Sequence, residues 1–284
     1  MTDALTDYLT ERGPKITSAR VVACAVEALT AFWQGCSVAD ITPQACERYA
    51  DWRGRSENTV RRELNVLATA AGYAFKNGRI TRKVHVVLPS KPPGKERWLS
   101  RREVALILRA ALQSDKARTY LPLFILIAVY TGRRKEAILS LRWCQIDLDA
   151  GLINFEGSTK RSNKRRGRIP IPKRLLPHLR RAAQGQPEMG FVLNINGARI
   201  CEIYRGLTAA AKRAGVECVA PHVLKHTAIT WAMQNRADLW EAAGFFATSV
   251  PTLIRVYGHH HPEHMRGVAE TIGRRPGVGS RMGR

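Results

Sequence analysis

Four short segments in the second half of the chain carry side chains that metal-free cleavage of a phosphodiester would require. Such a reaction needs a nucleophile that attacks phosphorus, cations that hold the phosphoryl oxygens, an acid for the leaving oxygen and a base for the nucleophile. Tyrosine, arginine, lysine and histidine can fill these roles. The segments are 131–143 (TGRRKEAILSLRW), 159–172 (TKRSNKRRGRIPIP), 221–227 (PHVLKHT) and 249–259 (SVPTLIRVYGH).

The first two segments supply cations. Gly132 permits a sharp turn that would place Arg134 at the start of a helix, where backbone N–H groups also favour an anion. The second segment is a basic hairpin in the sequence pattern, and its charge could equally serve to grip DNA phosphates without any part in the chemistry. Its basic residues are Lys160, Arg161, Lys164, Arg165, Arg166 and Arg168.

The last two segments supply His222, Lys225 and Tyr257. An isolated histidine or tyrosine on a helix is more often structural than catalytic, so these residues gain weight only from the four segments taken together. A histidine run over 259–261, with His264, suggests a metal site. Pro262 interrupts that spacing, and no carboxylate or cysteine stands at a recognisable distance from it. We therefore expect no metal and no other cofactor.

The four segments, in this order, resemble the sequence boxes of tyrosine recombinases of the phage integrase type. Segment 131–143 is similar to T-G-x-R followed by L-x-L-x-W, and segment 221–227 is similar to H-x-x-R. The resemblance implies that Tyr257 attacks the scissile phosphate and forms a 3′-phosphotyrosyl bond, while Arg134 and Lys225 neutralise the phosphoryl oxygens. It also implies that Lys160, with Lys164 as the second choice, protonates the leaving 5′ oxygen and that His222 assists proton movement.

Two positions depart from the family's pattern. Lys225 stands where a second arginine is usual, and a lysine keeps the positive charge but lacks the planar fork that holds two oxygens at once. Thr248 stands nine residues before Tyr257, where a histidine or tryptophan is usual. These departures support an alternative interpretation, a catalytically weak or inactive protein of the same fold that acts by sequence-specific DNA binding.

The charge of the chain indicates a polyanionic partner. Lysine and arginine total 46 against 23 acidic residues, a formal net charge of +23. Residues 1–94 hold 13 basic and 9 acidic residues, whereas residues 95–284 hold 33 and 14. Nucleic acid is the usual partner of such an excess. A basic architectural or RNA-binding protein would share the charge but leaves the ordered segments unexplained, and a type IB topoisomerase would share the chemistry.

The elements that must position these residues are mainly helical. Apolar residues recur at helical spacing in 21–32, 45–52 and 60–75, and segment 89–95 (PSKPPGK) is typical of an extended linker. Beyond it we expect a capped helix over 104–112, a buried helix over 121–131, a hairpin over 146–155, a short strand over 168–172 and then helices. The fold class is mainly α with a small antiparallel β-sheet. We predict two domains: 1–94, a helical core-binding domain, and 95–284, a catalytic domain with a C-terminal tail.

The family resemblance also sets expectations for partners. It implies that the two domains form a C-shaped clamp on double-stranded DNA attachment sites, that Arg61 and Arg62 contribute to DNA binding, and that a homotetramer assembles on DNA. A DNA-bending or directionality factor is a further expected partner. The start of the chain shows no secretory signal and no apolar run approaches the roughly 20 residues of a membrane span, so we expect a cytoplasmic protein. The six scattered cysteines predict buried, reduced thiols.

Overall fold

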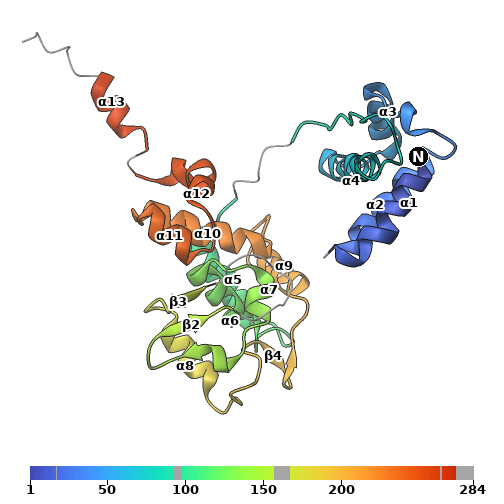
Figure 1. Cartoon of the computed structure of the whole chain (residues 1–284). Helices are drawn as coiled ribbons and strands as arrows, with labels where there is room; N and C mark the ends of the chain where they lie inside the picture. The colour runs from blue at the N-terminus through green and yellow to red at the C-terminus, as the bar shows by residue number, and fades with distance from the viewer. Residues whose placement is uncertain (17, 92–96, 157–166, 263, 273–284) are drawn as a thin grey trace, which may run out of the picture. The chain divides into compact units, whose positions relative to one another are not determined.

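The structure, a computed structural model, describes residues 1–16, 18–91, 97–156, 167–262 and 264–272 (Figure 1). Its contacts divide the chain into two units, Met1–Lys95 and Glu96–Arg284. The secondary structure is mainly helical with a small antiparallel sheet, which confirms the predicted fold class. No helix within the described ranges is long and apolar enough to cross a membrane.

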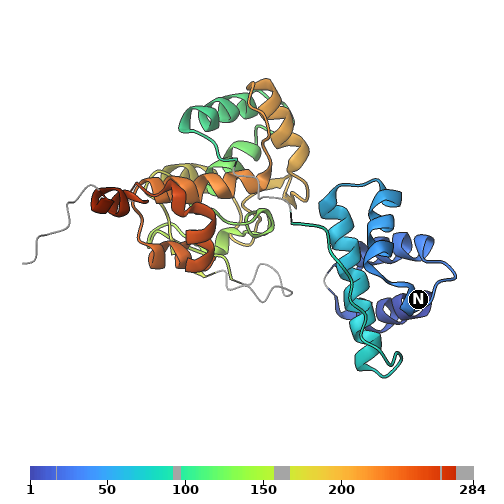
Figure 2. The same cartoon turned by 90° about the horizontal axis from the view of Figure 1, so that it is seen from above.

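The first unit is made of helices packed on one long helix, α4 (Figure 2). α4 contacts α1, α2 and α3, and its buried face includes Leu64 and Leu67. α3 shows why the ends fall where they do: Thr42 accepts the N–H of Ala45 at 3.2 Å, and Gly54 ends the helix in a left-handed conformation. The elements are α1 Thr2–Arg12, η1 Gly13–Lys15, α2 Ala19–Phe32, η2 Val38–Asp40, α3 Pro43–Arg53 and α4 Glu57–Lys76.

A polar cluster lies inside this helical unit. The Glu63 carboxylate is buried, accepts a hydrogen bond from the Tyr49 hydroxyl at 2.6 Å and pairs with the Arg53 guanidinium at 3.1 Å. A buried carboxylate is tolerated only when it is paired and hydrogen-bonded, so these contacts fix how α3 and α4 pack together.

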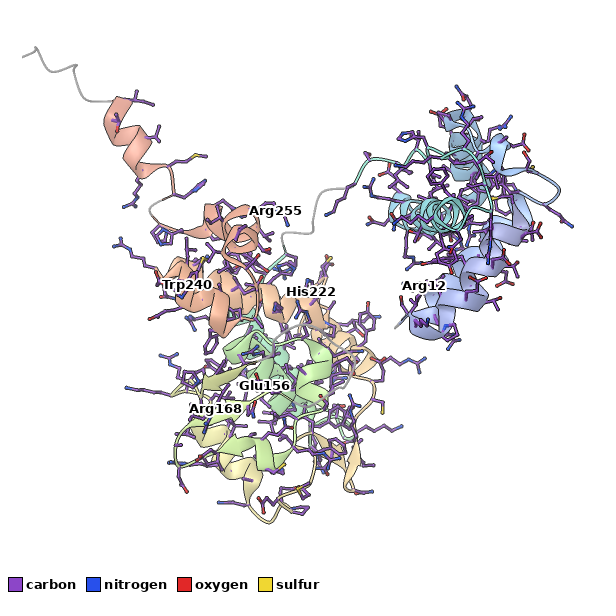
Figure 3. The ribbon with its side chains drawn as sticks, in the orientation of Figure 1. Arg12, Glu156, Arg168, His222, Trp240 and Arg255 are labelled. Carbon is purple, nitrogen blue, oxygen red and sulfur yellow. The ribbon has the colours of Figure 1, made fainter. Side chains whose placement is uncertain are left out.

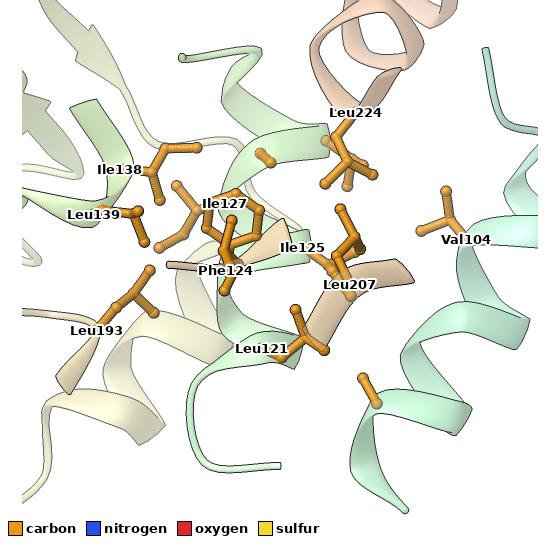
Figure 4. Close-up of a cluster of buried hydrophobic side chains, with 14 of the residues drawn as sticks. Val104, Leu121, Phe124, Ile125, Ile127, Ile138, Leu139, Leu193, Leu207 and Leu224 are labelled. Carbon is orange, nitrogen blue, oxygen red and sulfur yellow. The ribbon is translucent and has the colours of Figure 1, made fainter. Parts of the chain in front are cut away.

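The second unit is built around α6 (Leu121–Thr131), whose sequence is apolar on every side (Figure 4). A helix of this kind has to be buried on all faces, and α6 packs against α5 (Arg101–Leu112) and α10 (Pro221–Gln234). Leu99 joins the start of the unit to α10, because its N–H donates to the Thr227 hydroxyl and its carbonyl accepts from the Trp231 indole. α10, which carries most of the candidate site, is thereby fixed to the core.

A three-stranded antiparallel sheet follows α7 (Lys135–Leu139) and η3 (Trp143–Gln145). β1 (Ile146–Asp147) pairs with β2 (Leu152–Asn154), which pairs with β3 (Arg168–Pro170). The hairpin over 146–155 and the strand that begins at Arg168 are as predicted. The remaining elements are α8 Leu176–Ala183, β4 Asn194–Ile195, β5 Ala198–Arg199, α9 Tyr204–Arg213, α11 Leu239–Phe245, α12 Val250–Tyr257, η4 Gly258–His260 and α13 Arg266–Ile272.

Two expectations from the sequence were wrong. Residues after Lys173 were expected to be helical, but β4 and β5 form a second hairpin, whose turn places Asn196 and Gly197 at positive φ. The cysteines are free thiols, yet only one of the six, Cys46, is buried. Cys24 shows why composition misled the prediction: it lies on the exposed side of α2, opposite the apolar stripe. The other exposed cysteines are Cys144, Cys201 and Cys218.

Candidate active site

The helix α10 carries the centre of the candidate site. Pro221 occupies its first turn, which suits a residue with no N–H to donate and a fixed φ. His222, Lys225 and His226 follow at spacings of three and four residues, so their side chains share one face of the helix. The rings of His222 and His226 meet edge to face, with centroids 4.4 Å apart.

Lys225 lies within this group as a buried cation. Its side chain is 6% exposed, and its Nζ donates a hydrogen bond to the carbonyl oxygen of Phe246 at 3.0 Å. The ammonium is also close enough to lower the pKa of both neighbouring histidines. The carbonyl contact ties α10 to the end of α11 and holds a positive charge near both histidines.

Tyr257 is the last residue of α12 and is 5% exposed. Burial raises the pKa of its hydroxyl to about 12, so the group is a neutral phenol at physiological pH. Its Oη lies 2.7 Å from Nδ1 of His226, although the two residues are 31 positions apart in the sequence. The Tyr257 and His226 rings are tilted at 41° with centroids 5.5 Å apart.

His226 is the residue of this site that the sequence analysis missed. It follows Lys225 directly and stands four residues after His222, so the helical spacing of segment 221–227 was a signal that could have placed both histidines on one face. Burial lowers the pKa of His226 to about 4, and His222 and Lys225 add to the effect. The His222 side chain is exposed to solvent on one side. Desolvation on its packed side lowers its pKa, and the charges of Lys225 and Arg134 lower it further.

Arg134 is positioned by the glycine turn that the sequence predicted. Gly132 ends α6 at φ +58°, and Arg134 is the residue that precedes the first turn of α7. Its side chain is exposed and acts electrostatically on His222. The preceding Arg133 is buried instead, with its guanidinium carbon 4.9 Å from the centroid of the Phe155 ring. The acidic residue of this segment, Glu136, pairs with Arg199 at 3.0 Å.

The other predicted residues lie at varied positions. Thr248 is half-buried in the turn between α11 and α12, where its N–H donates to the Ala243 carbonyl at 3.0 Å. Arg168 is exposed at the start of β3 (Figure 3). In the first unit Arg62 is exposed, and Arg61 donates to the carbonyl of Pro89. Five basic residues fall outside the described residues: Lys160, Arg161, Lys164, Arg165 and Arg166.

No group of three or more histidine, cysteine or acidic side chains in the described part of the chain could hold a metal ion. Within the histidine run, the rings of His259 and His260 lie 4.0 Å apart, and His260 meets the edge of Trp98 at 5.9 Å. The described site therefore offers a phenol, two neutral imidazoles and two cations, the buried Lys225 and the exposed Arg134.

This set of groups lies within the region that matches a known family. The sequence profile of the Phage integrase family matches residues 97–264, more than half of the chain. The chain belongs to the phage integrase family. Its relatives include a XerC tyrosine recombinase of Pseudomonas aeruginosa, 28% identical over 80% of this chain and 61% of the relative. The XerA tyrosine recombinase of Thermococcus kodakarensis is 23% identical over 78% of this chain and 84% of that protein.

A XerC relative from Pseudomonas syringae is 28% identical over 67% of this chain and 45% of its own length. The chain thus spans only about half to three fifths of these two Pseudomonas relatives. Among solved structures, the Tn1549 transposon integrase in complex with a circular intermediate DNA has a TM-score of 0.75, with 13% identity over 95% of this chain and 98% of that one. A lambda integrase dimer bound to a core site has a TM-score of 0.70, with 16% identity over 93% of this chain and 77% of that one. These likenesses establish the integrase fold.

Proposed function

We propose that this member of the phage integrase family is a site-specific DNA recombinase that cleaves and rejoins DNA through a 3′-phosphotyrosyl bond at Tyr257. The main support for the proposal is one observation: α12 places the Tyr257 hydroxyl against the face of α10 that bears His222, Lys225 and His226. Two separate segments of sequence thus bring a nucleophile, a cation and imidazoles together, and Arg134 from a third segment acts electrostatically on His222. A protein that only binds DNA does not need this arrangement.

In the proposed reaction, Tyr257 attacks the scissile phosphorus while Arg134 and Lys225 stabilise the charge that develops on the phosphoryl oxygens. Lys160 gives a proton to the departing 5′ oxygen, and His222 assists proton movement around the phosphate. Because the bond energy is kept in the phosphotyrosine, the 5′ hydroxyl of a partner strand can reverse the step. Neither a nucleotide nor a metal is consumed.

The proposed substrate is double-stranded DNA at attachment sites, used for integration or excision of a mobile element. The charge of residues 95–284 supports a DNA partner, and the exposed Arg62 and Arg168 are candidates for phosphate contacts together with Arg61 and the basic segment over 160–166. We propose that residues 1–94 form the core-binding domain of a C-shaped clamp and that residues 95–284 form the catalytic domain.

Assembly on DNA belongs to the same proposal. A lambda integrase of similar fold has been solved as a tetramer bound to a Holliday junction. That structure supports the proposal that this chain forms a homotetramer on two DNA sites. We propose further that it works in the cytoplasm with a DNA-bending or directionality factor.

Two observations favour a second candidate, a sequence-specific DNA-binding protein with little activity. Lys225 is committed to the Phe246 carbonyl, and Tyr257 is buried. Loss of one bidentate phosphate contact would slow cleavage by on the order of 10²–10³-fold, by analogy with removal of one oxyanion donor. A slowed enzyme would still form covalent adducts, whereas a pure binding protein would form none.

The deciding experiment is covalent trapping. Duplexes selected from a random pool for binding would be nicked so that cleavage releases a short strand, and SDS-resistant adducts would be counted without metal. We expect an adduct that disappears in Tyr257→Phe, persists in the matched control Tyr204→Phe at an exposed tyrosine, and increases in Lys225→Arg. Specific binding without an adduct in any variant would overturn the proposal in favour of the DNA-binding protein.

A further inference from the structure

The Tyr257 hydroxyl has a partner that the family resemblance did not supply. In the structure its Oη lies 2.7 Å from Nδ1 of His226, and the ring of His222 meets the His226 ring edge to face with centroids 4.4 Å apart. The three rings therefore form a row, Tyr257 to His226 to His222, that runs from a buried phenol to an exposed imidazole.

From this geometry, and on the basis of the proposed function, we infer that His226 is the catalytic base that accepts the proton of Tyr257 during attack on phosphorus. His222, which the sequence analysis favoured for proton movement, is then the outer member of the row. It steadies the His226 ring and faces solvent.

The protonation states fit this role. A neutral imidazole has one nitrogen lone pair and one N–H, and a phenol hydroxyl can donate to the lone pair. Because desolvation lowers the pKa of His226 to about 4, its ring is neutral near pH 7 and Nδ1 can accept, with the ring hydrogen on Nε2. Because burial raises the pKa of Tyr257 to about 12, the hydroxyl keeps its proton until a base removes it.

The gap between these two pKa values disfavours proton transfer in the DNA-free protein, so the pair rests as a neutral hydrogen bond. A phosphodiester anion beside His226 would favour the imidazolium form, and the developing bond to phosphorus would acidify the phenol. Transfer is then coupled to arrival of the scissile phosphate. The tyrosine is thereby kept unreactive until DNA is bound.

The Oη–H proton passes to Nδ1 of His226 as the bond from Oη to phosphorus forms, and the bond from phosphorus to the 5′ oxygen breaks as that oxygen takes a proton from Lys160. The products are a 3′-phosphotyrosine, a free 5′ hydroxyl, an imidazolium at His226 and a neutral lysine. Religation runs the same steps in reverse.

Two charged or titratable neighbours, His222 and Lys225, act on the pKa of His226, and further titratable groups lie on the elements that pack against α10. His222 and Lys225 act on it from its own helix, and Tyr257 faces it from α12. Tyr130 belongs to α6, which packs on α10, and η4, which also contacts α10, carries two more histidines, His259 and His260.

The test compares His226→Asn with His222→Gln in the full chain, on ordinary DNA and on DNA with sulfur in place of the bridging 5′ oxygen. A thiolate leaves without protonation, so the sulfur substrate bypasses the acid but still needs the base. In His226→Asn the amide can accept a hydrogen bond but cannot carry the proton. We expect cleavage to fall by about 10²–10⁴-fold on both substrates with DNA binding unchanged. Lys160→Ala should be rescued by sulfur.

The pH profile gives an independent measurement. In the unaltered chain the cleavage rate should fall toward acid pH, because protonated His226 cannot accept a proton, and this limb should be absent in His226→Asn. A second variant, His226→Gln, with unfolding temperature and DNA affinity measured in parallel, separates a lost base from a misfolded site.

Three results would overturn the inference: full cleavage by His226→Asn, rescue of that variant by the sulfur substrate, or a larger loss in His222→Gln on both substrates. The unaltered chain is the reference that separates the two proposals. If it forms an adduct through Tyr257 while one of these three results appears, the recombinase proposal stands and the assignment of His226 falls.

Discussion

A methyl group added at Gly132 would test how the site is positioned. Gly132 lies at φ +58°, where residues with a side chain are strained, and a Cβ built there would stand 2.5 Å from Cδ1 of Phe246 and 3.3 Å from the Cβ of Ala228. The Phe246 carbonyl is the acceptor of the Lys225 ammonium. The substitution Gly132→Ala should therefore disturb both the turn before Arg134 and the hydrogen bond that positions Lys225.

The magnitude follows from two terms. A left-handed conformation costs an alanine about 1 kcal/mol after the smaller entropy of the unfolded alanine chain is counted. The steric overlap adds about 1–3 kcal/mol, since Phe246 is buried and has to shift. The sum is about 2–4 kcal/mol, which lowers the unfolding temperature of a unit of this size by roughly 5–15 °C.

Gly151→Ala is the matched control, because Gly151 lies at φ +65° in the same unit with nothing within 4 Å of the added Cβ. Its free energy of unfolding should fall only by the conformational cost of about 1 kcal/mol, which lowers the unfolding temperature by roughly 2–4 °C. Thermal and urea unfolding of both variants would be compared. In addition, Phe246→Leu combined with Gly132→Ala should destabilise by less than the sum of the single changes. Equal losses in the two glycine variants, or full additivity in the double variant, would refute the steric argument.

Three further predictions concern stability. The His226 side chain takes a proton near pH 6.5 when unfolded but only near pH 4 when folded, so protonation of the unfolded state removes stability as pH falls through this window. Between pH 7.5 and 4.5 the free energy of unfolding should drop by about 2–3 kcal/mol more in the unaltered chain than in His226→Gln, and parallel curves would contradict the pKa. Ala247→Gly should raise the free energy of unfolding by about 0.5–1 kcal/mol in urea titrations, because Ala247 lies at φ +48°. A lower free energy of unfolding would show that the backbone at Ala247 is not strained. Arg53→Met should destabilise the first unit by about 2–4 kcal/mol, because it leaves the buried Glu63 carboxylate with only the Tyr49 hydroxyl as a partner. A further Glu63→Gln change should restore part of the lost stability, and urea titrations of both variants would measure it.

Much of the local structure could be predicted from the sequence, because its causes are local. Ser100 and Glu103 form the capping box that starts α5, as the pattern predicts. Gly132 ends α6, and the turn over 149–151 joins β1 to β2. The two residues Asn196 and Gly197 also carried a hairpin signal that the helical interpretation of the region overlooked.

The same distinction between local and long-range causes applies to the candidate site. The candidate residues in the family's boxes were selected by their order along the chain, since a box is a local pattern. The choice between Arg133 and Arg134 shows what order and structure each contribute: the motif selects Arg134, and the structure shows that Arg134 is exposed while Arg133 is buried against Phe155. The exposure of the cysteines depended on which face of each element met the core.

By itself, then, the sequence determined the family, the charge, the helical class and the positions of the turns, because each depends on residue types that are near one another in the chain. The pairing of Tyr257 with His226, and of Lys225 with the Phe246 carbonyl, was decided only by tertiary structure. Those contacts join residues 31 and 21 positions apart through the packing of α10, α11 and α12, and packing depends on the whole core at once.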